Sequence, residues 1–172
     1  PEIRTICTHH EQAAAMAAEA YGRISGKLGV ALVTAGPGSV NTVTGLVGGW
    51  TDSSPMMVIS GQSALSCVKF QEESHIRQYG VQGIFIKPFV EPATKYFKTV
   101  DDPANIQYYM EEAYYHATTG RPGPVWIDVP LDVQRMEVPL KLQQGFVPPQ
   151  SSMDIAALEQ AAVADRALTG GH

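Results

Sequence analysis

The stretch GVALVTAGPGSVN, residues 29–41, decides the fold class of this chain. Its first half, GVALVT (29–34), is an uninterrupted apolar run, and a Gly-Pro-Gly turn at 36–38 follows almost at once. Strands covered by helices on both faces of a parallel sheet have such continuous apolar sequences. The stretch therefore predicts a buried parallel strand that leads through a tight turn into a helix.

Strand-like and helix-like segments alternate on both sides of this stretch. Such alternation predicts an α/β fold, a three-layer sandwich with a mainly parallel sheet of about five or six strands. The predicted strands are RTICT (4–8), 29–34, 56–61, 95–100 and 124–130, and the predicted helices are 9–25, 39–50, 102–120 and 153–168. Residues 143–152 have the composition of a linker.

The composition excludes several classes of function. The 172 residues are 44% hydrophobic with a net charge of -5, and no Lys/Arg run suggests a nucleic-acid partner. No apolar run is long enough to span a membrane. Cys7 and Cys67 form no CxxC pair, which predicts buried free thiols and a cytoplasmic protein. The histidines form no recognisable metal-ligand set, so no metal site is expected in this chain.

Glu11 has two competing interpretations. Thr8 followed three residues later by Glu11 is a capping box for a helix that starts here. Ligands of open parallel sheets, however, bind at the carboxyl ends of the strands. Glu11, the stretch 34–41 and Gly61–Gln62 each follow a predicted strand, so they should meet at that edge, where Glu11 could act as an acid.

Three further stretches also have two interpretations each. The turn TAGPGSVN (34–41) is either a plain connection or a close approach to a ligand. The polar cluster FQEESHIRQYG (70–80) is either a solvated surface or the mouth of a site. Arg121 either holds an anion or caps a helix, and Asp128 needs a partner if its strand is buried.

Five motifs in order resemble the acetolactate synthase-like family of thiamine diphosphate-dependent enzymes. The resemblance covers residues 9–134 and corresponds to the N-terminal pyrimidine-binding domain of that family. The motifs are HEQAAAMAAEAYGR, LVTAGPGSVNTVTGL, SPMMVISGQ, FQEESHIRQYG and ATTGRPGPVWIDVPLDVQ.

The resemblance implies roles for eight residues. Glu11 would hydrogen-bond N1′ of the cofactor's aminopyrimidine, where a carboxyl group stabilises the imino tautomer of the ring. The other cofactor-binding residues would be Thr34, Pro37 and Asn41 around the pyrimidine, Gln62 near the ring, and Arg121 toward FAD in flavin-containing members.

Phe70 and Gln71 match a phenylalanine–glutamine pair that faces the reacting carbonyl from the partner subunit. Glu11, Gln71 and Phe70 are thus the expected catalytic residues. Two departures favour a side group of decarboxylases and carboligases. Leu131 replaces a lysine that is usual in acetohydroxyacid synthases, and the stretch 78–89 looks longer than its counterpart there.

The resemblance also implies the setting of the whole protein. It would decarboxylate a 2-keto acid and join the fragment to an acceptor carbonyl, as a homodimer or homotetramer. The diphosphate-binding domain of a second subunit would complete the site, and Mg²⁺ would be bound by a domain not in this chain. The alternatives are a simple 2-keto acid decarboxylase and a catalytically silent pairing module.

The resemblance divides the chain into two parts. Residues 1–142 would be the pyrimidine-binding domain without its usual first strand and helix, which would lie before Pro1. Residues 143–172 would be a linker and the start of a truncated central domain. On this interpretation the chain supplies half a site and is inactive alone.

Overall fold

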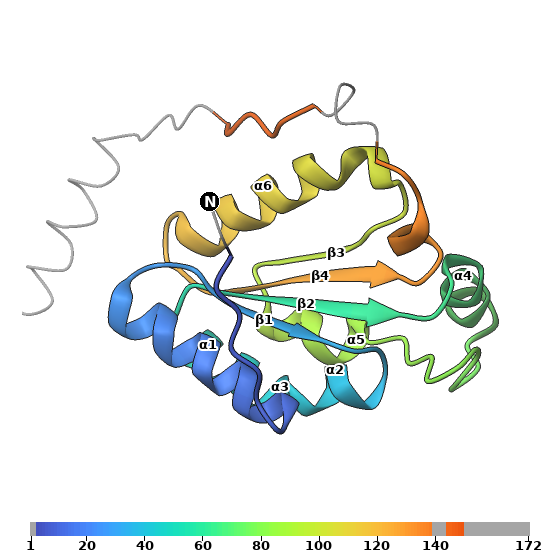
Figure 1. Cartoon of the computed structure of the whole chain (residues 1–172), viewed down its shortest axis with the longest axis horizontal. Helices are drawn as coiled ribbons and strands as arrows, with labels where there is room; N and C mark the ends of the chain where they lie inside the picture. Colours follow the sequence, from blue (N-terminus) through green and yellow to red (C-terminus); the bar gives the residue numbers. More distant parts are fainter. Residues whose placement is uncertain (1–2, 139–143, 150–172) are drawn as a thin grey trace, which may run out of the picture.

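The computed structural model of the chain describes residues 3–138 and 144–149. The helices and strands alternate along the chain as the sequence predicts (Figure 1). In order they are α1 (Glu11–Ser25), β1 (Gly29–Val33), α2 (Pro37–Asn41), α3 (Val43–Thr51), β2 (Met56–Gln62), α4 (Leu65–Ser74), α5 (Lys87–Val90), η1 (Glu91–Ala93), β3 (Tyr96–Thr99), η2 (Pro103–Asn105), α6 (Ile106–Thr118), β4 (Pro124–Pro130) and η3 (Val133–Arg135).

The four strands of the described residues form one parallel sheet in the order β1-β2-β4-β3. The register pairs Val33 with Ser60, and Ser60 with Asp128. All carboxyl ends therefore lie along one edge of the sheet. The parallel α/β prediction is confirmed, although the expected five or six strands are four in this part of the chain.

Helices cover the two faces of the sheet and give three layers (Figure 1). On one face, the fully buried Trp126 and Val58 pack with Leu46 of α3 and Val90 of α5. On the other face, residues of β2 and β4 pack with Ala113 and Ala117 of α6. Burial on both faces is the physical reason why the strand sequences are continuously apolar.

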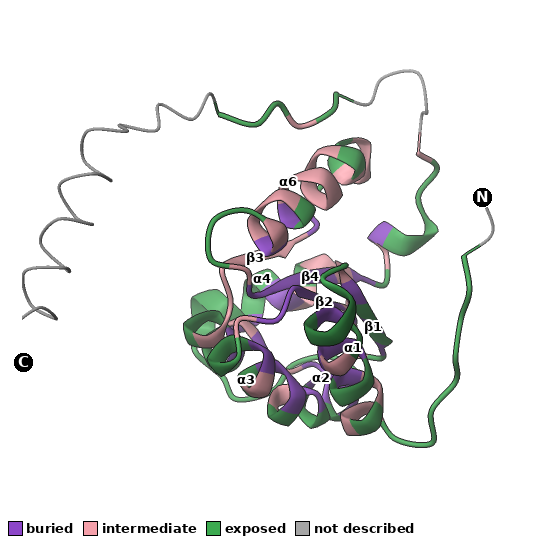
Figure 2. Cartoon of the chain, turned by 90° about the vertical axis from the view of Figure 1, so that its left-hand side faces the viewer, coloured by how far each residue is buried: buried purple, intermediate pink, exposed green. Residues whose placement is uncertain are grey.

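The predicted strand at 4–8 is wrong. Residues 3–8 are exposed and form no strand, with Ile6 77% accessible (Figure 2). β1 pairs only with β2, so no described strand supplies hydrogen bonds to this β-prone run. A short strand without a partner is not stable in water. Cys7, expected to be a buried thiol, is exposed for the same reason, while Cys67 is partly buried.

The helix predicted at 39–50 is divided into α2 and α3. The division falls at Thr42, whose buried hydroxyl donates a hydrogen bond of 2.7 Å to the carbonyl of Ser39. A threonine hydroxyl that bonds to a nearby carbonyl competes with regular helix geometry. The predicted linker is described only over 144–149, and the predicted helix at 153–168 lies outside the described residues.

Candidate functional site

The start of α1 and the turn after β1 meet at the carboxyl edge of the sheet, as the sequence predicts. α1 runs back toward the start of β1, which brings its first residue, Glu11, to this edge (Figure 1). Asn41, at the end of α2, donates a side-chain hydrogen bond of 3.1 Å to Oε2 of Glu11. Two residues 30 positions apart in the sequence are thereby joined in one cluster.

The predicted capping box is absent at this helix start. The N-cap of α1 is His10, whose Nδ1 accepts the backbone N–H of Gln12 at 3.1 Å. Thr8 instead donates its hydroxyl to the carbonyl of His10. The imidazole occupies the capping position, so the Glu11 side chain is left to reach across to Asn41 rather than back to Thr8.

Two glycines allow close approaches at the Gly-Pro-Gly turn. Gly36 has φ +61°, and a Cβ on it would collide with the backbone carbonyl oxygen of Gln82. A Cβ on Gly38 would lie 2.6 Å from Cγ2 of Thr34 and 3.4 Å from Oε1 of Glu11. Side chains are excluded at both positions, and the carboxylate of Glu11 faces bare backbone at Gly38.

The charge state of Glu11 follows from its surroundings. A backbone N–H at the helix start, and after it the side chain of Asn41, hold the pKa of Glu11 below its usual value. Both groups donate hydrogen bonds that favour the charged form. The partial positive charge at the start of α1 acts in the same direction. Glu11 is therefore an anchored, half-exposed carboxylate.

Other residues from the predicted cofactor set lie near this cluster. Pro37 is the first residue of α2 and is exposed. Thr34 is exposed beside the turn, and its carbonyl accepts the hydroxyl of Ser39 at 2.8 Å. The structure thus brings together four of the predicted residues, namely Glu11, Thr34, Pro37 and Asn41.

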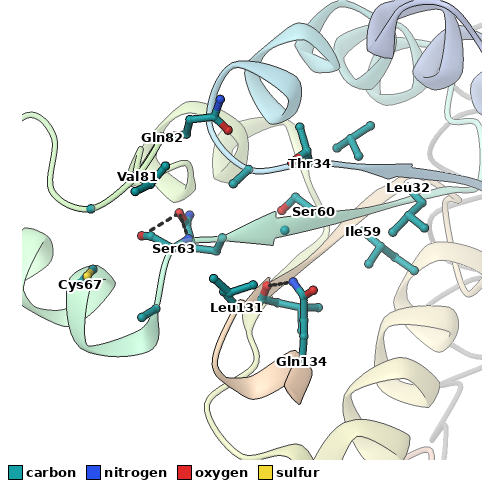
Figure 3. A pocket seen from close by; sticks show the side chains of 17 residues that line it. Leu32, Thr34, Ile59, Ser60, Ser63, Cys67, Val81, Gln82, Leu131 and Gln134 are labelled. Atoms are coloured by element: carbon teal, nitrogen blue, oxygen red, sulfur yellow. Dashed lines mark hydrogen bonds between the residues drawn. The ribbon is translucent and has the colours of Figure 1, made fainter. Parts of the chain in front are cut away.

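An open cavity of about 730 Å³ lies next to the turn, at the carboxyl ends of β1, β2 and β4. Its wall is mainly apolar, with Leu32, Ile59 and Leu131 among the lining side chains (Figure 3). Thr34 and Gln62 line it, whereas Glu11 and Asn41 do not. The acid and the cavity are thus neighbours along the edge of the sheet but do not form a single pocket in this chain.

Gln62 is held inside the protein, with 5% of its surface accessible. Its Nε2 donates to the carbonyl of Ile84 at 2.9 Å and to Oδ2 of Asp128 at 3.1 Å, and its Oε1 accepts the N–H of Ser63 at 2.9 Å. Every amide atom of this side chain is therefore used within the protein.

Asp128 is a charged residue of the site for which the motifs give no role. Its side chain in β4 is 1% accessible and accepts the hydroxyl of Ser60 at 2.5 Å. Burial raises the pKa of Asp128 to about 6, and the bonds from Ser60 and Gln62 oppose that rise. An aspartate within the apolar strand PVWIDVP was the available signal, but the sequence could not name its partners.

Phe70 and Gln71 point in different directions from α4. Phe70 is 47% accessible, and its ring packs against Tyr79 with centroids 4.7 Å apart. Gln71 is buried and donates its amide to the carbonyl of Arg77 at 2.8 Å. The structure therefore presents Phe70 outward and uses Gln71 to hold the following segment.

Arg121 lies at the opposite edge of the sheet from Glu11. It precedes β4, and its Nε donates a hydrogen bond of 2.6 Å to the hydroxyl of Ser53, which precedes β2. Its carbonyl accepts Nζ of Lys95 at 2.7 Å. The amino ends of the strands meet here, so the structure does not bring Arg121 together with the other predicted residues.

Two other kinds of feature are absent from the described part of the chain. Within 3–138 and 144–149, no helix is long and apolar enough to cross a membrane. Within the same ranges, no three His, Cys, Asp or Glu side chains are grouped so that they could hold a metal ion.

Comparison with known proteins agrees with the resemblance seen in the motifs. The family model described as thiamine pyrophosphate enzyme, N-terminal TPP binding domain, matches residues 1–84. The acetolactate synthase large subunit of Lactococcus lactis subsp. lactis is 45% identical over 139 residues, which is 79% of this chain and 22% of that protein.

Two other relatives come from different organisms. The acetolactate synthase of Arthrospira platensis is 41% identical over 140 residues, covering 80% of this chain and 22% of that protein. A probable acetolactate synthase large subunit of Methanocaldococcus jannaschii is 40% identical over 136 residues, covering 79% of this chain and 22% of that protein. The chain spans less than a quarter of each of these three relatives. It belongs to the thiamine pyrophosphate enzymes and corresponds to the N-terminal, thiamine pyrophosphate-binding domain of their acetolactate synthase-like members.

Proposed function

We propose that Glu11 is the acid that hydrogen-bonds the aminopyrimidine ring of thiamine diphosphate in a 2-keto acid decarboxylase and carboligase. The observation that carries this proposal is the contact between Glu11 and Asn41 beside the bare backbone of Gly38. A carboxyl oxygen that faces a glycine leaves room for a flat ring, and Asn41 fixes its direction. The residues present therefore fit the pyrimidine end of the cofactor.

The contribution of this chain's own residues follows from that arrangement. Bound thiamine diphosphate supplies the carbanion chemistry that removes CO₂ from a 2-keto acid. A ring that covers the half-exposed Glu11 would desolvate the carboxyl and raise its pKa. Glu11 could then carry a proton at Oε1 while Oε2 keeps its bond from Asn41. Thr34 and Pro37 would line the same side of the ring.

The finer features of the whole protein belong to the same proposal. The exposed Phe70 on α4 would face a second subunit in a homodimer or homotetramer, whose diphosphate-binding domain would hold Mg²⁺. Gln71 would reach a substrate carbonyl only by releasing the carbonyl of Arg77. FAD, if held by Arg121, would bind at the opposite edge from Glu11. The two free cysteines fit a reducing compartment such as the cytoplasm.

The variant E11Q in the complete protein tests this function. With pyruvate, thiamine diphosphate and Mg²⁺, we expect kcat to fall at least about 100-fold, because an amide cannot transfer the proton. CO₂ release and acetolactate formation are the measurements. The matched control is E19Q, which removes another carboxylate of α1 that bonds Ser54 and Arg23 away from this edge.

Three outcomes would contradict the proposal or part of it. Acetaldehyde without acetolactate would indicate a simple decarboxylase. Unchanged turnover in E11Q, or no turnover in the unmodified protein, would indicate a silent pairing module. Enzyme-like CO₂ release by residues 1–172 alone would contradict the expectation that this chain supplies half a site.

A further inference from the structure

The carboxylate of Asp128 is buried without a cation. Within the described residues it forms no salt bridge, and its hydrogen-bond donors are the hydroxyl of Ser60 and the amide of Gln62. Nε1 of the fully buried Trp126 donates to Oγ of Ser60 at 2.8 Å. The indole N–H thus directs the Ser60 hydroxyl proton toward Asp128. A buried charge kept by two neutral donors needs a reason, because its desolvation is costly.

Gln62 connects this carboxylate to the segment Arg77–Ile84. One amide group bonds both Oδ2 of Asp128 and the carbonyl of Ile84, so the direction of the first bond fixes the second. An amide rotated by half a turn would place its oxygen against the carboxylate. The negative charge of Asp128 therefore selects the orientation in which Nε2 holds Ile84.

The segment Arg77–Ile84 is held at both ends by buried glutamines. Gln71 holds the carbonyl of Arg77 at 2.8 Å, and Gln62 holds the carbonyl of Ile84 at 2.9 Å. Between these ends, the carbonyl of Gln82 lies against Gly36 so closely that a Cβ could not fit. Residues of this segment also line the open cavity (Figure 3).

We propose that Asp128 is a positioning residue, which orients Gln62 and thereby holds Arg77–Ile84 as a fixed wall beside the Gly36–Pro37 turn. The relevance of the wall to catalysis rests on the proposed function, because that turn adjoins Glu11. The positioning itself depends only on contacts within the chain, and it can be tested without cofactor.

Protonation of Asp128 should loosen the wall. A neutral carboxyl group carries a proton on one oxygen, so Ser60 or Gln62 then loses a charged acceptor. The charged groups on neighbouring elements do not face Asp128: Lys98 of β3 pairs with Asp101, Lys87 of α5 pairs with Glu91, and Asp132 accepts the N–H of Leu65. The pKa of about 6 places this change within an accessible range.

Hydrogen exchange of the complete protein, followed by mass spectrometry, tests the proposal. In D128N at pH 7.5, we expect the amides of 77–84 to exchange at least about tenfold faster, the effect of losing one charged hydrogen bond. In the unmodified protein, the same acceleration should appear below about pH 6 after correction for intrinsic exchange. D128N should lack this pH dependence. E19Q serves as the control and should exchange like the unmodified protein.

A second variant covers the case in which D128N does not fold. Q62M removes the amide at similar side-chain volume and should accelerate exchange in 77–84 to a similar extent, again without pH dependence. Unchanged protection of 77–84 in both variants, or in Q62M alone if D128N does not fold, would overturn the proposal. Because exchange is measured without cofactor, this result is independent of whether E11Q loses turnover.

Discussion

Glu11 and Asp128 are two carboxyl groups near the same edge of one parallel sheet, but their surroundings are opposite. Glu11 is half-exposed, and its helix start and Asn41 lower its pKa. Asp128 is 1% accessible, and burial raises its pKa to about 6. The comparison shows how one edge serves two purposes: an accessible acid can face a ligand, while a buried acid can orient the groups around it.

The largest expected effect concerns the pH dependence of stability. The pKa of Asp128 is raised from an ordinary value of 3.8 to about 6 by burial. The folded protein therefore retains a proton that the unfolded chain has lost between about pH 4 and pH 6. The contribution of Asp128 to stability is greatest below about pH 4 and is lost as pH rises through about 6, by about 3 kcal/mol.

Denaturant unfolding between about pH 4 and pH 7.5 measures this contribution as the difference between the unmodified protein and D128N. Other titrating groups cancel in that difference. Equal pH slopes for the two proteins would show that Asp128 does not titrate in this range, and the contrast with Glu11 would disappear.

A somewhat smaller effect is expected for S60A. This change removes a donor from Asp128 and leaves the buried indole N–H of Trp126 without its acceptor. We expect a loss of about 2 kcal/mol in the free energy of unfolding at about pH 7.5. The pKa of Asp128 should rise further, because the Ser60 bond lowers it. S66A on the exposed surface of α4 is the control, and equal losses in both variants would refute the buried network.

E11Q should have no measurable effect on the melting temperature, in contrast to S60A. The Glu11 side chain is half-exposed and does not cap α1, since His10 occupies that position. Thermal unfolding followed by circular dichroism provides the measurement. A clear fall in melting temperature would indicate a structural role for Glu11 and would weaken the catalytic interpretation.

The smallest effect is expected for N41A, which changes only the environment of the Glu11 carboxylate. Because the Asn41 amide lowers the pKa of Glu11, its removal should raise that pKa. Carbon-13 chemical shifts of the Glu11 carboxyl group, recorded against pH, report the change. T44A, on the exposed side of α3, should leave the titration unaltered. An unchanged midpoint in N41A would show that the contact is not formed in solution.

Local sequence patterns were sufficient for most of the fold. The continuous apolar runs at 29–34 and 56–61 predicted buried parallel strands because both faces of such strands must be covered. The β-prone run at 4–8 failed because a strand also needs a neighbour, and local propensity does not provide one. The capping box at Thr8 failed because the histidine before Glu11 takes the capping position, a choice that the pattern does not encode.

The sequence by itself determined the class of fold, the family and the meeting of Glu11 with the turn at Gly36–Gly38, because strand order and helix direction follow from alternation along the chain. Only the tertiary structure decided that Gln62 and Gln71 point inward, that Arg121 lies at the opposite edge, and that Asp128 is bonded to Ser60 and Gln62. Side-chain direction and burial depend on partners that are distant in sequence, and those partners are brought together only when the chain packs.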